Sequence, residues 1–198
     1  MSAGFKKHGI ILNVTSDIYK SADIHIITGP HYAKDQWLSH ERVILIDRAY
    51  YHPEKSGKWS SMDWLSVGWM NKLGGRDFIE GQGRILPEVK KSTGNKTIFL
   101  ADYNGIVEKA DIVRLHPAQK KYKTTLLEDL RQCHTATAYG TTSLVMAGLM
   151  GLKTVCKDKS SIMHQDNWLQ LLPYADWRYS EIISGKLWEH LQLSLDRL

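Results

Sequence analysis

The sequence predicts an α/β protein made of two small Rossmann-like halves, each built on a parallel sheet, with a cleft between the halves. Apolar segments of strand length alternate with segments of helical length along most of the chain. The apolar segment 42–51 is almost continuous, which is typical of a strand that a parallel sheet buries on both faces. After residue 96 the alternation of strand and helix repeats, which is the pattern of a doubly wound sheet.

The first half, residues 1–90, is expected to contain three strands. Its first strand alternates between polar and apolar residues, becomes apolar, and stops at Gly29 and Pro30. The polar segment from His52 to Asp63 is typical of a loop. The strands are expected at residues 22–28, 42–51 and 64–70, with a short helix at residues 31–39.

The second half, residues 91–198, follows a polar, turn-rich segment near residues 80–96. It is expected to open with a strand that runs into a loop, and to close with helices. Its expected elements are strands within 97–105 and 110–117, a helix at 126–133, a strand at 134–139, a helix starting at 140–143, a strand at 153–157, and helices within 162–195.

The composition is that of a globular protein, with 42% apolar and 24% charged residues. No apolar run is long enough for a membrane span and no secretory signal is recognisable, so a cytoplasmic location is expected. Cys133 and Cys156 are expected to be buried free thiols. The net charge of +5 favours an anionic partner such as a nucleotide, an anionic glycan or nucleic acid. The densest basic run, at residues 120–123, fits a solvated loop better than a nucleic-acid contact.

The segment Gly140-Thr141-Thr142-Ser143 is the strongest candidate for a ligand site. It lies where a helix is expected to begin directly after a strand, so the first N–H groups of the helix lack intrahelical partners and can bind phosphate. The glycine allows close approach of the backbone, and the three hydroxyl groups add donors. The alternative is an ordinary helix cap, which serine and threonine also favour.

Arg114 and His116 end the expected strand 110–117. The strand period of two places both side chains on the same side, where they could together complement a diphosphate. The alternative is that His116 and Pro117 simply turn the chain. Asp102 and Asn104 follow the previous strand and are expected either to face the ligand cleft or to form a surface turn.

Two residues of the first half are candidates for acid–base chemistry. His31 follows the first strand and could act as a general base on an acceptor hydroxyl, with Asp47 orienting it or serving as the base itself. The alternatives are a capping or core histidine and a structural ion pair between Asp47 and Arg48. Walker A, GxGxxG, HExxH and GxSxG motifs are absent from the sequence.

The second half contains five motifs in chain order: RLHP (114–117), LLEDLRQC (126–133), TAYGTTS (137–143, which includes Tyr139), AGLMGLKTVC (147–156) and YADWRYSEIISGKLWEHL (174–191). With these motifs the second half resembles the nucleotide-sugar-binding half of GT-B glycosyltransferases, in particular bacterial capsule-polysaccharide and related phage-type transferases, in a shortened form. The resemblance covers about two-fifths of the chain, while GPHYA (29–33) and ILIDRAYY (44–51) match an acceptor half only loosely.

This resemblance implies that Arg114, His116 and residues 141–143 contact the diphosphate of a nucleotide sugar, with UDP the expected nucleotide and with no metal or other cofactor required. The sugar would be transferred to an acceptor hydroxyl, on a hydroxymethylated base in DNA or on a glycan. Many members of the family carry a glutamate in the following helix, where this chain has Met146. The alternative is therefore an inactive GT-B-like protein that binds a nucleotide ligand or a protein partner.

Overall fold

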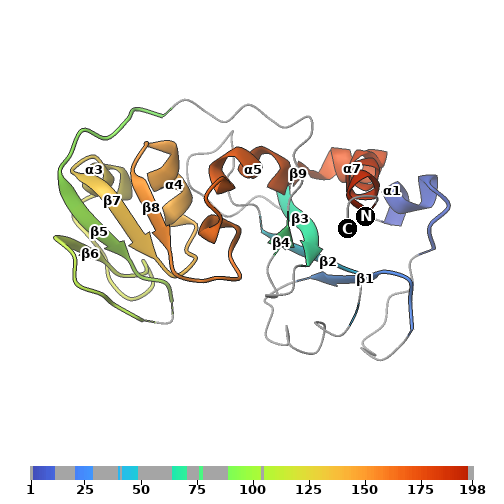
Figure 1. The fold of residues 1–198 in the computed structure, drawn as a ribbon, viewed down its shortest axis with the longest axis horizontal. Coiled ribbons are helices and arrows are strands. Elements are labelled where there is room, and N and C mark those ends of the chain that lie inside the picture. The colour runs from blue at the N-terminus through green and yellow to red at the C-terminus, as the bar shows by residue number, and fades with distance from the viewer. Residues whose placement is uncertain are drawn as a thin grey trace. The chain divides into compact units, whose positions relative to one another are not determined.

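The computed structural model describes residues 2–11, 21–28, 40, 42–48, 64–70, 76–77, 89–103 and 105–195 (Figure 1). The chain forms two compact units. The sheet A unit comprises Met1–Arg84 and Leu171–Leu198, and the sheet B unit comprises Ile85–Gln170. Helix α5 (Trp168–Ala175) contains residues of both units.

Sheet A is mixed. Its strands lie in the order β1-β2-β3-β4, and β9 also pairs with β3. Only β1 and β2 are parallel, whereas β3 runs antiparallel to β2, β4 and β9. The strands are β1 (His25–Thr28), β2 (Val43–Arg48), β3 (Trp64–Met70), β4 (Arg76–Asp77) and β9 (Asp176–Arg178).

One face of sheet A carries the core of this unit. Ile44 and Ile46 alternate along β2, and Val67 and Trp69 along β3, so all four side chains project to the same side. They pack against apolar residues of α1 (Ser2–Lys7), α6 (Tyr179–Ser184) and α7 (Lys186–Leu195). The Trp69 indole N–H donates to the Leu191 carbonyl oxygen at 3.2 Å. Helix α1 approaches α6 so closely that a Cβ at Gly4 would lie 1.9 Å from the Ile182 carbonyl oxygen.

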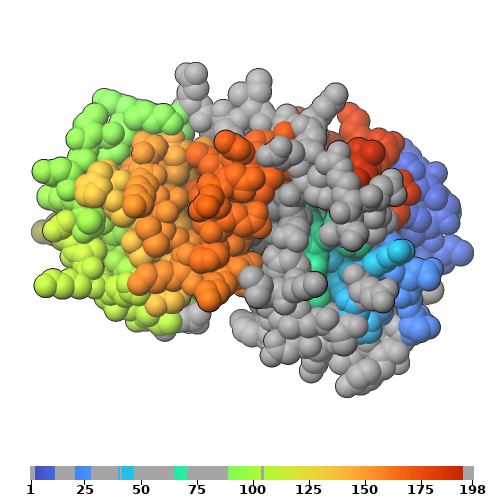
Figure 2. All heavy atoms as spheres, viewed as in Figure 1, coloured from blue at the N-terminus to red at the C-terminus, as the bar shows by residue number. Residues whose placement is uncertain are grey.

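Sheet B is entirely parallel, with the strand order β6-β5-β7-β8. In Figure 2 the atoms of this unit, coloured green through orange, form one continuous body. Its elements are β5 (Lys96–Leu100), β6 (Ile112–Arg114), α3 (Leu126–Leu130), β7 (Cys133–Ala138), α4 (Ser143–Leu149), β8 (Lys153–Cys156) and the 3-10 helix η1 (Ile162–His164).

The crossover connections of sheet B cover its two faces differently. Helices α3 and α4 lie together on one side of the sheet (Figure 1). The coil 101–111 joins β5 to β6 in the opposite direction across the sheet, so a right-handed crossover places it on the other face. In agreement, Arg114 contacts Asp129 of α3, whereas Phe99, whose position in β5 has the opposite parity to that of Arg114 in β6, contacts Tyr139, which in turn donates to Glu108 of the coil.

The structure confirms the α/β class and the parallel sheet of the second half. The expectation of a parallel sheet in the first half is wrong, because β2 and β3 are antiparallel. The connection at residues 49–63 is long enough either to cross over to a parallel strand or to lead back into an antiparallel one, so its length does not predict the direction of β3.

The division into units also differs from the expected boundary at residue 90. The C-terminal segment groups with the first half, because β9 pairs with β3 and the helices α6 and α7 cover sheet A. Cys133 and Cys156 are buried and free, and burial raises the pKa of both thiols. Over the described part of the chain, no helix combines the length and apolar character that crossing a membrane requires.

Candidate functional site

The candidate site is the edge of sheet B at which its four parallel strands end. Starting from β5, the chain first adds β6 on one side and then passes back over β5 to add β7 on the other. The point between β5 and β7 is therefore a topological switch point, where open α/β sheets bind their ligands. The segments that follow these two strands are 101–103 and 139–142.

The turn between β7 and α4 leaves backbone and side-chain donors unused. Gly140 has a φ of 106°, which favours glycine, and α4 begins after Thr142. The Thr142 hydroxyl makes no capping hydrogen bond, so the ordinary helix-cap interpretation does not account for it. Among the described residues, the N–H groups of Gly140, Thr141 and Thr142 meet no hydrogen-bond acceptor, while the Ser143 N–H points to the Thr141 hydroxyl at 3.4 Å. Successive N–H groups of this kind suit an anion.

Asp158 lies beside this turn. Its Oδ1 accepts hydrogen bonds from the Ser160 N–H at 2.9 Å and the Ser160 hydroxyl at 2.7 Å. Its Oδ2 faces Gly140, where an added Cβ would come within 3.2 Å of the oxygen. The second carboxylate oxygen is thus held in place next to the turn, where it can accept a hydrogen bond from a hydroxyl group.

A polar cluster links the coil face to the same edge. Glu108 accepts a hydrogen bond from the Tyr139 hydroxyl at 2.9 Å and forms an ion pair with Lys157. The Lys157 hydrogen bond is the main reason why the pKa of Glu108 lies below its usual value, and the same bond raises the pKa of Lys157. The hydrogen bond to Glu108 raises the pKa of Tyr139. Tyr139 is therefore a neutral donor that, with Lys157, fixes the coil 101–111.

His116 presents one ring nitrogen for binding. Its Nδ1 lies 3.2 Å from the Ala118 N–H and accepts from it, so in the neutral ring the proton resides on Nε2. The ring also meets that of Tyr103 edge to face, with the centroids 5.5 Å apart. The contact joins the ends of β6 and β5. Among the described residues Nε2 meets no hydrogen-bond partner, so its N–H is available to a ligand at this edge of the sheet.

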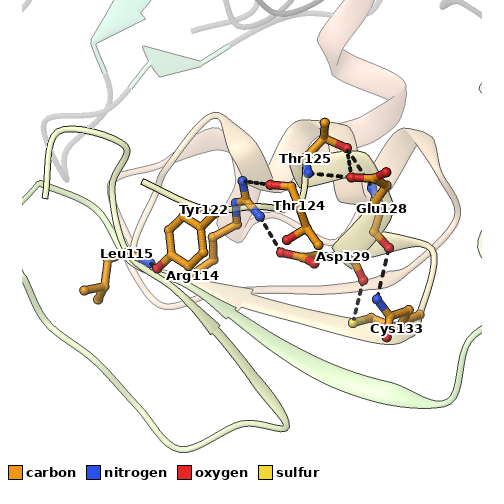
Figure 3. A network of polar contacts seen from close by, with 9 residues as sticks. Arg114, Leu115, Tyr122, Thr124, Thr125, Glu128, Asp129 and Cys133 are labelled. Atoms are coloured by element: carbon orange, nitrogen blue, oxygen red, sulfur yellow. Dashed lines mark hydrogen bonds and ion pairs between the residues drawn. The ribbon is translucent and has the colours of Figure 1, made fainter. Parts of the chain in front are cut away.

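Arg114 has a different position from the one expected. Its guanidinium forms an ion pair with Asp129, donates to the Thr124 carbonyl oxygen at 3.0 Å, and lies 4.5 Å from the centroid of the Tyr122 ring (Figure 3). Because β6 ends at Arg114, the strand period does not extend to His116, and among the described residues the two side chains share no partner. Arg114 thus holds α3 and the preceding loop to the sheet.

The structure brings most of the predicted residues of the second half to one edge. Asp102, His116, Tyr139, Gly140, Thr141, Thr142 and Ser143 all follow the ends of sheet B strands. Asn104 and His31 lie outside the described residues, as does the side chain of Asp47, whose backbone is in β2.

Three further residues lie at this edge that the sequence did not indicate as ligand-binding. Lys157 and Asp158 directly follow β8, and the rule that selected Asp102 could have found them. Glu108 lies in a coil with no periodicity, so nothing in the sequence indicated its partners. The described residues contain no group of three or more His, Cys, Asp or Glu that could hold a metal ion.

The chain was compared with protein-family models, curated proteins and solved structures, and none of them matches it.

Proposed function

We propose that the protein binds a nucleotide-activated sugar at the carboxyl edge of sheet B and transfers the sugar to an acceptor hydroxyl. The observation that carries the proposal is the turn 140–142 at the switch point of a parallel sheet, where the N–H groups and the Thr142 hydroxyl meet no hydrogen-bond partner among the described residues. This turn is suited to a diphosphate. The GT-B-like arrangement of two halves around a cleft belongs to the same proposal.

The turn 140–142, His116 and Asp158 would each have a role in this reaction. The N–H groups of the turn and the Nε2–H of His116 would bind the diphosphate, whose negative charge grows as the glycosidic bond breaks. Asp158 Oδ2 would accept a hydrogen bond from a hydroxyl of the ribose or the sugar. The Asp158 carboxylate would thereby take the place of the glutamate of the GT-B family, since Met146 of α4, which stands at that position, cannot accept this hydrogen bond. Arg114 has no part in donor binding, because Asp129 already neutralises it.

The acceptor side of the proposal depends on the first half. His31 or Asp47 would deprotonate the acceptor hydroxyl. The acceptor is a hydroxymethylated base in DNA or a glycan, and a base in DNA would have to leave the stack first. The two free cysteines agree with a reducing cytoplasm as the site of the reaction.

The test is nucleotide release from a panel of nucleotide sugars, together with calorimetric binding of the corresponding nucleotides. Each variant has a matched control in the same unit: His116→Ala with His134→Ala, and Thr142→Ala with Thr93→Ala, the control residues being exposed. Loss of one hydrogen bond to a charged phosphate should weaken nucleotide binding roughly tenfold. Unchanged binding in both site variants would show that the pocket is elsewhere.

The competing function is nucleotide binding without turnover. The observation that favours it is Arg114, because the ion pair with Asp129 removes the strongest expected cation from the diphosphate. Tight binding with no nucleotide release, in the presence of DNA and glycan acceptors, would establish this second function and exclude transfer.

A further inference from the structure

Next to the candidate site, the loop 117–124 carries three exposed lysines, Lys120, Lys121 and Lys123. It connects β6 to α3 and therefore starts at the same edge of sheet B as the turn 140–142. None of the three forms an ion pair with a described acidic residue. Three cations thus lie close together on one short loop, without an acidic partner among the residues that the structure describes.

Contacts of Tyr122 and Arg114, drawn in Figure 3, hold this loop in place. The Tyr122 hydroxyl accepts a hydrogen bond from the Leu115 N–H at 2.6 Å, and the Arg114 guanidinium lies against the Tyr122 ring. Arg114 also holds the Thr124 carbonyl oxygen. The backbone that carries the lysines is therefore held in place, and the Lys120 ammonium lies 5.1 Å from the centroid of the Tyr122 ring. This order lowers the entropy lost when the loop binds a partner.

The loop is joined to an exposed aromatic ring. The Gln119 side-chain amide donates to the Tyr103 carbonyl oxygen at 3.1 Å, and His116 meets the Tyr103 ring. Tyr103 is 67% exposed, although it is a large aromatic residue. Gln119, which is bonded to Tyr103, is adjacent to Lys120 in the chain, and the run from Lys120 to Lys123 spans at most about 14 Å. A few nucleotides can therefore reach from the ring to the cations.

We propose that Tyr103 and the lysines of the loop 117–124, where the sequence alone favoured a solvated loop, form a binding surface for single-stranded nucleic acid. An exposed ring offers a stacking surface to any base, and the neighbouring cations pair with phosphates, which is how single strands are held without sequence preference. The role of this surface in catalysis rests on the proposed function, since it would present a polynucleotide acceptor to the donor site. The binding itself does not depend on that function.

The experiment is fluorescence anisotropy with a labelled single-stranded oligodeoxynucleotide of about twelve nucleotides, without any nucleotide sugar, from about 50 to 200 mM salt. The test variant changes Lys120, Lys121 and Lys123 to Gln. Its control removes three charges near the opposite edge of the sheet: Lys90→Gln, Arg131→Gln and Lys153→Gln, all at exposed positions.

The test variant should bind about a hundredfold more weakly at 0.1 M salt, and its slope of log Kd against log salt should fall by about 2, since each phosphate contact contributes about 0.7. The control variant should bind like the unchanged protein. Tyr103→Ala should weaken binding roughly tenfold, whereas Tyr103→Phe, which keeps the ring, should not.

Absence of binding at low salt, equal weakening in the test and control variants, or no effect of Tyr103→Ala would each overturn the proposal. Stronger binding of heparin that is independent of Tyr103 would instead identify an acidic-polysaccharide surface. These outcomes are distinguishable from failure of the proposed function, because His116→Ala and Thr142→Ala affect nucleotide binding, which the anisotropy experiment does not measure.

Discussion

Arg114 illustrates how the partners of one side chain decide its role. Its guanidinium makes an ion pair, a carbonyl hydrogen bond and a ring contact, and both side chains of the ion pair are largely buried, at 14% and 9% exposure. A lysine could not reproduce this planar arrangement. The residue belongs to the framework that fixes the loop 117–124 rather than to the diphosphate site.

Arg114→Ala should lower the free energy of unfolding by about 3 kcal/mol, because it leaves the Asp129 carboxylate buried without its cation. Urea unfolding followed by circular dichroism measures the change. Arg131→Ala, at an exposed position of the same unit, should change it by less than about 0.5 kcal/mol. If the variant is as stable as the unchanged protein but binds nucleotide more weakly, Arg114 contributes to ligand binding and not to the framework.

His190 on α7 gives the sheet A unit a dependence on pH. It lies against the rings of Tyr174 and Trp177, at centroid distances of 6.1 and 5.1 Å, and burial lowers its pKa. The unfolded ring, with a pKa of about 6.5, therefore takes up a proton first as the pH falls. Its contribution to stability is present above that value and is lost as the pH falls through 6.5 toward the lower pKa of the folded state.

His190→Phe should reduce the difference between the urea midpoints at pH 7.5 and pH 5.5, since phenylalanine retains the ring packing and cannot be protonated. Part of the difference should persist, because burial and the neighbouring His40 also lower the pKa of His25. The same difference in the variant and the unchanged protein would exclude a role for His190.

At the scale of elements, the strands were more predictable than their pairing. Strand β3 lies at the expected residues 64–70, and β2 lies within the expected 42–51, with Val43 to Ile46 all buried. Apolar patterning fixes which segments are buried. It does not determine direction, so the antiparallel pairing of β2 with β3 could not be read from it.

The coil 101–111 is the element that the contacts of Glu108 with Tyr139 and Lys157 hold in place. Glu108→Gln removes the ion pair with Lys157, so the amides of residues 105–110 should exchange faster with deuterium. Hydrogen exchange followed by mass spectrometry measures this change. Asp166→Asn, at an exposed position of the same unit, is the control and should leave these amides unchanged. Equal exchange in both variants would mean that other contacts hold the coil.

For the whole molecule, the least predictable feature was the return of the C-terminal segment to sheet A. Strand β9 has only three residues, Asp176–Arg178, and it lies between α5 and α6. A strand of three residues shows no detectable alternation of apolar and polar residues, and the flanking residues have a helical pattern. The candidate site was more accessible to prediction, because the ends of consecutive parallel strands meet at one edge wherever the sheet lies.

The contiguous sheet B unit should fold when residues 85–170 are expressed alone. Trp168 is the single tryptophan in this segment; it is buried, and its indole N–H donates to the Thr154 hydroxyl at 3.1 Å. Its fluorescence should shift to the red in one cooperative urea transition. Gly148→Val should abolish or greatly weaken this transition, since even a Cβ would lie 2.6 Å from the Trp168 ring. Red-shifted fluorescence without urea would show that the segment needs the rest of the chain.

The discontinuous make-up of the sheet A unit also sets an order of events during synthesis. Residues 85–170 leave the ribosome as a complete set and can fold at once, since domains generally fold as units as they emerge. Strand β3 must wait for β9, and the buried faces of Ile44 and Trp69 must wait for α6 and α7. Until then the early strands expose apolar surface, so the nascent first half is open to aggregation until the C-terminal segment has been made.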